Sequence, residues 1–339
     1  MLPEQIKDKV VSEKIPIDVQ FELTWRCNQR CVHCYQYDPQ EDILSTDQIK
    51  NIILQLKEAG TLYISFTGGE PLLRPDFWEI AQFANDHHFA LILQTNAVLI
   101  DEKAAEKIAQ LNFFTVHISL LGANSKTHDD ISQIPGSFDK TMRAARLLTD
   151  RGVRVVLNLT LLKQNFGEYN QVKALKEQLG SDIDIRISPY VFYKNNGDSD
   201  PARFRLDDRE TRDFFLSERE RSGGSRLINR MLMCNFGYSV CLINARGEVY
   251  PCVAVPVVAG DLKCQSFKDI WEESLVFKAI RARKLEELVE CGKCSLSEWC
   301  FRCSGFSYLE SGDMFGCSSE AKRVAKIVRE VNEYEKAEV

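Results

Sequence analysis

Three cysteines stand close together near the start of the chain, in the run Cys27-Asn-Gln-Arg-Cys31-Val-His-Cys34. A [4Fe–4S] cluster is normally held by four cysteine thiolates, so this C-x3-C-x2-C loop can ligate three irons of such a cluster. The fourth iron would lack a protein ligand, and an open coordination position is where a substrate or cofactor binds. Two other interpretations are a zinc site completed by His33 and a set of unpaired structural cysteines. We expect His33 to pack around the cluster or cofactor.

Eight further cysteines lie in the last third of the chain, and they are Cys234, Cys241, Cys252, Cys291, Cys294, Cys300, Cys303 and Cys317. Eight thiolates suffice for two complete four-cysteine clusters. Paired C-x2-C motifs are also a common zinc spacing, so a zinc ribbon is the alternative for these cysteines taken alone. The remaining cysteine, Cys264, is expected to be a small buried hydrophobic residue, with a spare thiol near substrate as the minority interpretation.

The composition limits the classes of protein to consider. The chain has 339 residues and 12 cysteines, and 44% of its residues are hydrophobic, which supports a buried core. Its net charge of −6 argues against nucleic acid or an anionic membrane as the main partner. We see no signal peptide and no apolar run of about 18 residues, so we expect a cytoplasmic protein. Disulfides seldom persist in that compartment, and metal or redox chemistry therefore explains the cysteines better.

A scaffold must position these cysteines, and the hydrophobic pattern indicates its type. Apolar β-rich runs alternate with helix-period runs from residue 19 to about 190, which is typical of a parallel α/β sheet or barrel. Six repeats are too few for a closed eight-stranded barrel, so we predict an open, partial (β/α)6 TIM-type barrel with ligands at the carboxyl ends of its strands. His117, inside the fourth strand, is expected in the core. The predicted strands are 19–24, 62–67, 90–95, 113–120, 153–161 and 183–188.

Helix patterns and a polar segment complete the organisation. The stripe Ile49, Ile52, Ile53 and Leu56 predicts a helix after the first strand. The polar segment 194–200 interrupts the α/β alternation. After it we expect a charged helix near 207–220, a strand pair around 242–250 and one helix near 266–283. The predicted division is an N-terminal extension (1–18), the barrel (19–193), a linker with a bridging helix (194–230), a small cysteine-rich domain (231–320) and a C-terminal helix (321–339).

A second motif, Thr67-Gly68-Gly69-Glu70-Pro71, follows the second predicted strand. Glycines permit close backbone approach to a ligand, and a carboxylate can accept hydrogen bonds from an ammonium group. Together with the cysteine loop one strand earlier and the segment 118–122 (ISLLG), this turn resembles the radical S-adenosylmethionine (SAM) enzymes.

The resemblance implies a mechanism and a set of cofactor contacts. The three cysteines of the first loop would hold the cluster, and SAM would chelate its open iron through amino and carboxylate groups. One electron from the reduced cluster would cleave a C–S bond of SAM and yield a 5′-deoxyadenosyl radical, which abstracts a substrate hydrogen. The two glycines and the glutamate of the turn would line the amino group of SAM's methionine part. A serine at the end of the fourth strand would lie near the carboxylate or ribose of SAM. An asparagine on the fifth strand would lie near the same end of the sheet. These implied residues are Gly68, Gly69, Glu70, Ser119 and Asn158.

The C-terminal cysteines resemble the SPASM extension of some radical SAM proteins, which houses two auxiliary iron–sulfur clusters. The implied ligands of one auxiliary cluster are Cys234, Cys241, Cys252 and Cys303. Those of the other are Cys291, Cys294, Cys300 and Cys317. With the SAM-binding cluster, the resemblance implies three [4Fe–4S] clusters. The last cysteine pair is spaced C-x2-C here, one residue shorter than the usual C-x3-C of the extension.

Enzymes with a SPASM extension often modify peptides, and the segment 303–306 (CSGF) looks most like those maturases. We therefore predict an oxidoreductase that cross-links or oxidises a ribosomally made peptide (RiPP biosynthesis). Only about 18 residues precede the first strand, so the expected partners are a separate leader-binding protein and a reductant such as flavodoxin or ferredoxin. The alternatives are modification of a small molecule or tetrapyrrole side chain, sulfatase-type protein maturation, and a non-catalytic zinc or iron–sulfur scaffold.

Overall fold

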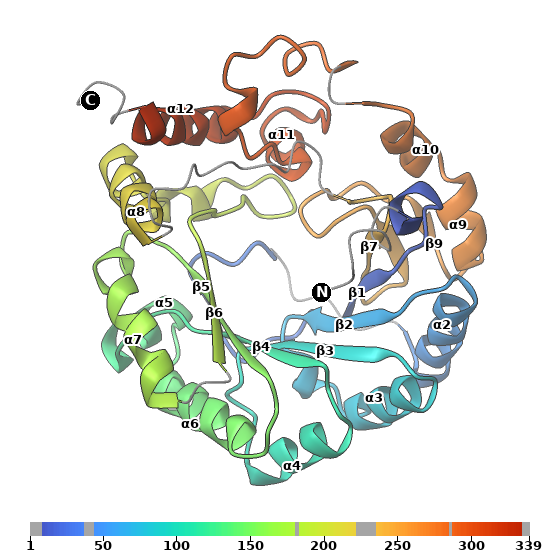
Figure 1. Cartoon of the computed structure of the whole chain (residues 1–339). Helices are drawn as coiled ribbons and strands as arrows, with labels where there is room; N and C mark the ends of the chain where they lie inside the picture. Colours follow the sequence, from blue (N-terminus) through green and yellow to red (C-terminus); the bar gives the residue numbers. More distant parts are fainter. Residues whose placement is uncertain (1–8, 37–43, 180–182, 222–234, 285–286, 334–339) are drawn as a thin grey trace.

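The computed structural model describes residues 9–36, 44–179, 183–221, 235–284 and 287–333. Within these residues, nine strands form a single sheet in the order β6-β5-β4-β3-β2-β1-β7-β8-β9. The sheet curves around a central space, and helices ring its outer side (Figure 1). This arrangement confirms the predicted partial barrel.

The first six strands are parallel neighbours, each paired with the next one along the chain. All six predicted strands are confirmed, with ends that differ by two residues at most. The strands are β1 (Asp18–Thr24), β2 (Tyr63–Gly68), β3 (Ala90–Thr95), β4 (Thr115–Ser119), β5 (Val155–Thr160) and β6 (Ile183–Ser188).

Helices connect these strands and cover the outer face of the sheet. The predicted stripe is confirmed on α2, where all four of its apolar residues are buried, and Ser45 begins the helix with a capping box to Gln48. The connecting helices are α2 (Thr46–Glu58), α3 (Phe77–Asp86), α4 (Glu102–Gln110), α5 (Ser125–Ser132), α6 (Ser137–Thr149) and α7 (Tyr169–Leu179), with short 3-10 turns η1 (Pro71–Leu73) and η2 (Phe166–Glu168).

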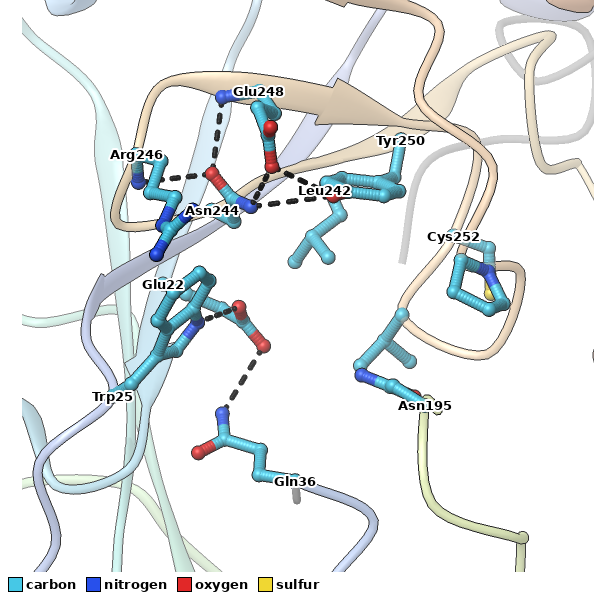
Figure 2. Close-up of a pocket in the computed structure, with 12 residues that line it drawn as sticks. Glu22, Trp25, Gln36, Asn195, Leu242, Asn244, Arg246, Glu248, Tyr250 and Cys252 are labelled. Carbon is cyan, nitrogen blue, oxygen red and sulfur yellow. Dashed lines mark hydrogen bonds between the residues drawn. The ribbon is translucent and has the colours of Figure 1, made fainter. Parts of the chain in front are cut away.

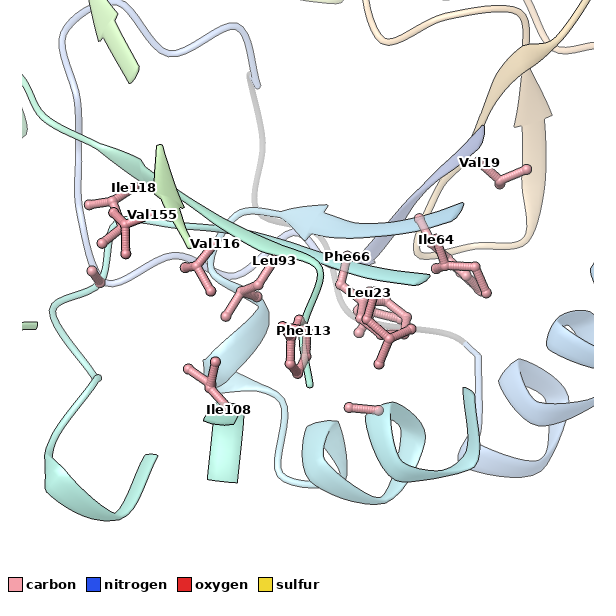
Figure 3. Close-up of a cluster of buried hydrophobic side chains, with 14 of the residues drawn as sticks. Val19, Leu23, Ile64, Phe66, Leu93, Ile108, Phe113, Val116, Ile118 and Val155 are labelled. Carbon is pink, nitrogen blue, oxygen red and sulfur yellow. The ribbon is translucent and has the colours of Figure 1, made fainter. Parts of the chain in front are cut away.

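The two faces of the parallel strands differ in polarity because successive side chains of a strand point to opposite faces. Val19, Phe66, Leu93, Val116 and Val155 point outward and pack against the helices in one large apolar core (Figure 3). The residues that alternate with them point into the barrel, and many of these are polar. The core therefore lies between sheet and helices, and the lumen is left free for chemistry.

The sheet continues beyond the six repeats through β7 (Val240–Ile243), β8 (Glu248–Tyr250) and β9 (Gly260–Asp261). β7 pairs in parallel with β1, and β8 pairs antiparallel with β7, so the predicted strand pair is confirmed. The single helix predicted near 266–283 is wrong, because two helices occupy this segment: α9 (Phe267–Glu273) and α10 (Leu275–Arg281). Ser274 is extended between them and its hydroxyl caps α10 by accepting from Val276 N.

The remaining elements lie across the open side of the barrel. α12 packs against α8 (Figure 1). Among the described residues, no helix is both long and apolar enough to cross a membrane. These remaining elements are η3 (Asp200–Phe204), α8 (Asp208–Arg221), η5 (Ser297–Trp299), α11 (Ser304–Ser311) and α12 (Ser319–Glu333).

Candidate functional site

A cavity of about 690 Å³ lies at the carboxyl ends of the barrel strands. This is the end at which parallel α/β proteins gather their binding loops. Nearly all cofactor-contact residues predicted for the barrel line this one cavity. They are Cys27, Cys31, Cys34, Gly68, Gly69, Ser119 and Asn158.

The three thiols of the first loop lie close to one another. Burial raises the pKa of Cys31 well above its ordinary value, and negative charge on Cys34 and Cys27 would raise it further. Among the described residues, however, no three His, Cys, Asp or Glu side chains converge tightly enough to hold a single metal ion. A cubane cluster needs one thiolate on each iron and not convergence on one point. The donor set therefore fits an iron–sulfur cluster better than the zinc site with His33.

The glycine pair of the second motif packs against the cysteine loop. Gly68 has φ of +129°, and a Cβ there would lie 2.1 Å from Thr24 O, while a Cβ on Gly69 would lie 2.3 Å from Arg26 O. Two hydrogen bonds use this closeness, from Gly69 N to Thr24 O (2.8 Å) and from Glu70 N to Arg26 O (2.8 Å). Glycine is thus required because the turn lies directly against the start of the cysteine loop. The two hydrogen bonds hold this part of the loop against the end of β2.

The Glu70 side chain has a different place from the one predicted. It is fully buried and does not line the cavity. Its carboxylate accepts hydrogen bonds from Thr95 Oγ1 (2.8 Å), Asn96 N (2.8 Å) and Leu72 N (3.2 Å). Burial raises the pKa of Glu70 to about 7, although these hydrogen bonds act to lower it. Glu70 therefore joins the ends of β2 and β3 and caps η1, a role that the following Pro71 signals in the sequence.

Several polar residues that line the cavity were not predicted. Gln94 on β3, Thr160 on β5 and Ser188 on β6 all point into it. His117 on β4 also lines it, so the expectation that His117 lies in the core is wrong. Burial, followed by the charges of two nearby arginines, lowers the pKa of His117 to about 4, which keeps the ring neutral. These positions can be found from the sequence, because the side chains of a strand alternate between its two faces and the alternation puts these residues on the lumen face.

Four of the C-terminal cysteines come together. Burial raises the pKa of Cys300 to about 12, and the charges of Cys291, Cys317 and Cys294 add to this effect, so the four thiols share one electrostatic environment. Cys294 N also donates to Cys291 O at 3.2 Å within the tight turn that carries the pair. These are the four residues that the resemblance implied for one auxiliary cluster.

The four cysteines implied for the other auxiliary cluster are brought together only in part. Cys234 lies outside the described residues. Cys252 and Cys303 belong to adjacent segments, because a Cβ on Gly305 would lie 2.3 Å from Ala254 Cβ. Cys241 is fully buried in the apolar core and pairs with Val19, whose side chain points to the helix-covered face. Cys252 follows β8 and is only partly buried. It lines a cavity beside the barrel that Cys241 does not reach.

Cys264 corrects another expectation. Its side chain is exposed, in the turn that follows β9, and its backbone N donates to Asp261 O at 3.0 Å. The thiol is therefore not a core residue, and it does not line the barrel cavity.

Comparison with known families agrees with this geometry. Residues 21–174 match the family model of the Radical SAM superfamily, and residues 234–304 match SPASM, described as an iron–sulfur cluster-binding domain. The mycofactocin maturase MftC of Mycobacterium tuberculosis H37Rv is 31% identical over 310 residues, which cover 84% of this chain and 77% of that protein. The chain belongs to the radical SAM enzymes that carry a SPASM domain, and it binds SAM and iron–sulfur clusters.

Other similar proteins have names that point to different substrates. The AdoMet-dependent heme synthase of Methanosarcina barkeri is 28% identical over 328 residues, covering 87% of this chain and 93% of that protein. Among solved structures, Streptococcus suis SuiB bound to its precursor peptide SuiA has a TM-score of 0.73 at 17% identity, covering 94% of this chain and 80% of that one. The enzyme anSMEcpe with bound AdoMet and Kp18Cys peptide has a TM-score of 0.71 at 18% identity, covering 95% and 97%. At these identities the two structures show a shared fold.

Proposed function

We propose that this enzyme abstracts a hydrogen atom from a ribosomally made peptide, which is then cross-linked or oxidised. The observation that carries the proposal is the single cavity lined by the three-cysteine loop, the glycine turn and the polar lumen residues. When bound, the reduced cluster and SAM supply a 5′-deoxyadenosyl radical for this abstraction. The relation to the peptide-maturing MftC supports the choice of a peptide.

The residues of the chain position the cofactor and enclose it. In the proposal, Cys27, Cys31 and Cys34 hold the cluster, and the backbone of Gly68 and Gly69 lies beside the methionine end of SAM. Glu70 holds the turn in place and does not touch the ligand.

The polar ends of β4 and β5 complete the proposed SAM site. Ser119 and Asn158 are register partners on these neighbouring strands. Both line the cavity, so their hydroxyl and amide groups can reach the carboxylate or ribose of SAM together.

We further propose three clusters in all. Cys291, Cys294, Cys300 and Cys317 would hold one auxiliary cluster, because their thiols share one environment. Cys234, Cys252 and Cys303 would ligate the second. Cys241, the fourth residue of the implied set, is buried in the apolar core, and we do not assign it as a ligand. The auxiliary clusters would relay electrons between substrate and an external reductant such as flavodoxin or ferredoxin. We also propose that a separate protein recognises the leader of the peptide, and that the enzyme is cytoplasmic.

Modification of a tetrapyrrole side chain is the second candidate function. The observation in its favour is the heme synthase relative, which aligns over 93% of its own length. A tetrapyrrole carries propionate groups, and a peptide carries amide groups and a C-terminal carboxylate. The two functions therefore differ in the substrate that enters the barrel and not in the cofactor chemistry.

Anaerobic reconstitution tests the proposed function directly. We expect about twelve irons per chain, that is four for each of three clusters. With dithionite and SAM, 5′-deoxyadenosine should form, and Cys31→Ala should abolish it. Cys264→Ala is the matched control and should behave like wild type because its thiol is exposed and does not line the barrel cavity. Isolation with zinc alone, or an active Cys31→Ala variant, would overturn the assignment. Mass spectrometry of candidate precursor peptides co-expressed with the enzyme then decides between peptide and tetrapyrrole.

A further inference from the structure

A second cavity of about 260 Å³ lies beside the SAM cavity. It is formed by β1, the β7–β8 hairpin and the segment around Asn195 (Figure 2). Trp25 and Gln36 line both cavities, so the two adjoin each other. Cys252, a proposed ligand of an auxiliary cluster, also lines the second cavity. A molecule held here would therefore lie between the SAM site and an auxiliary cluster.

The first carboxylate of this cavity already has its hydrogen-bond partners. Glu22 is buried and accepts from Trp25 Nε1 (2.8 Å), Tyr35 OH (3.3 Å) and Gln36 Nε2 (3.3 Å). Three donors on one carboxylate leave little need for a ligand donor.

The second carboxylate is also occupied. Glu248 accepts from Asn244 Nδ2 and from Tyr250 OH, both at 2.8 Å. Neither Glu22 nor Glu248 forms an ion pair with an arginine among the described residues. The carboxylates of the cavity thus order its walls.

Two groups in the cavity, in contrast, lack partners. Arg246 is the one cation among the lining residues, and its guanidinium stacks over Trp25 with 5.3 Å between the guanidinium carbon and the ring centroid. Its Nε is buried without a hydrogen-bond partner, and so is Asn195 Oδ1. Asn195 is held in place because its backbone N donates to Tyr35 O at 2.8 Å. Figure 2 shows the two residues on opposite sides of the cavity. A buried donor and acceptor left unpaired are costly unless a ligand satisfies them.

We propose that this cavity is a substrate subsite that binds a carboxylate group, with Arg246 as its anchor. A guanidinium pairs with a carboxylate through two parallel charge-assisted hydrogen bonds, and stacking on Trp25 fixes its plane. Asn195 Oδ1 then accepts an N–H of the amide next to that carboxylate. The carboxylate is either the C-terminus of a peptide or an Asp or Glu side chain. This inference rests on the proposed function, since it names the substrate group that the enzyme holds next to the SAM cavity.

Binding of peptide pools to the immobilised, anaerobically reconstituted enzyme with SAM present tests the subsite. Three N-acetylated pentapeptide pools are compared: free C-terminal acids without Asp and Glu, the same sequences as C-terminal amides, and amides that include Asp and Glu. We expect the acid pool to be retained at least about tenfold over the plain amide pool. Enrichment of the third pool would assign the carboxylate to a side chain.

Two arginine variants make the test specific. Arg246→Gln should remove the preference for acids. Arg246→Lys keeps the positive charge but cannot form the two parallel hydrogen bonds of a guanidinium, so it should retain part of the preference. Arg283→Gln is the matched control, because Arg283 also stacks on an aromatic ring, that of Phe315, away from the cavity. Equal retention of acid and amide pools, or an unchanged preference in Arg246→Gln, overturns the proposal.

The same preparations separate this inference from the proposed function. Wild-type enzyme that fails to cleave SAM but still selects acids would overturn the function and not the subsite. Active SAM cleavage beside equal retention of acids and amides would overturn the subsite alone. Displacement of the acid pool by coproporphyrin III, a tetrapyrrole with propionate groups, would keep the subsite and assign its carboxylate to a tetrapyrrole.

Discussion

At the scale of single residues, Cys241 shows how the face of a strand decides a role that spacing alone does not. The resemblance to the SPASM extension implies a ligand set that contains both Cys241 and Cys252, but successive side chains of β7 point to opposite faces. Leu242 points into the second cavity, where Cys252 also lies, so Cys241 points to the core beside Val19. A shift of a single residue along the strand would reverse this.

The first prediction follows from this placement. Cys241→Val should keep the iron and sulfide content of wild type, because the change is nearly volume-conserving in an apolar core and should cost less than about 1.5 kcal/mol. Cys252→Ala is the comparison, and it should lose up to about four irons per chain. Iron analysis and thermal unfolding measure both effects. Equal iron loss in the two variants would place Cys241 among the cluster ligands after all.

At the scale of elements, an ion pair between buried Arg74 and partly buried Asp76 holds the cysteine loop in position. Arg74, just after η1, donates to Asp76 Oδ1 at 2.7 Å, to Leu23 O at 3.1 Å and to Leu44 O at 2.8 Å. Asp76 in turn accepts from Thr46 Oγ1 at the start of α2. One arginine thus links the end of β1, which leads into the cluster loop, to the beginnings of two helices. Burial alone would raise the pKa of Asp76, but the hydrogen bonds from Arg74 and Thr46 outweigh it and lower the pKa.

The second prediction is that Asp76→Asn lowers the free energy of unfolding by about 3 kcal/mol, because it leaves the Arg74 charge buried and unpaired. A lowered carboxyl pKa contributes stability above the unfolded value of about 3.9 and loses it as the pH falls through the folded value. The deficit should therefore be constant between about pH 6 and 8 in urea unfolding of the reconstituted enzyme. Asp86→Asn, at an exposed helix site, should change stability little. A deficit that varies across this window would mean that another group titrates.

The elements themselves could be predicted well, because their signals are local. The six strands and the α2 stripe follow from hydrophobic periodicity, and the glycine turn from its place after β2. Roles that depend on side-chain direction could not be predicted in this way. His117 stands as one polar residue in an apolar run, which predicts a core position. Its register partner Gln94 on the neighbouring strand β3 lies on the lumen face, and so does His117. Glu70 similarly belongs to a motif, yet only its contacts with Thr95 and Asn96 show that it faces away from the cavity.

At the scale of the whole molecule, the barrel and the C-terminal segment are joined by one charged network. Glu320 on α12 has only 8% of its side chain exposed, and it accepts from Arg323 Nε and Nη2, both at 2.9 Å. Arg205, on the segment after β6, lies 3.7 Å from the same carboxylate, and Arg323 also pairs with Asp208 on α8 at 2.6 Å. Cys294 and Cys300 pack against an apolar cluster that includes Val324, Ala325 and Val328 of α12. The network therefore fixes the helix that packs beside Cys294 and Cys300, two of the proposed ligands of an auxiliary cluster.

The third prediction compares two glutamates of α12 that each pair with arginine, one buried and one exposed. Glu320→Gln should lower the free energy of unfolding by about 3 kcal/mol, because two partly buried arginines lose their shared counter-charge. Glu330→Gln removes an exposed pair with Arg212 at 2.6 Å and should cost less than about 1 kcal/mol. Since α12 supports Cys300, iron should also be released to a chelator faster from the Glu320 variant than from the Glu330 variant. If the two variants differ in stability but release iron at equal rates, iron retention does not depend on α12.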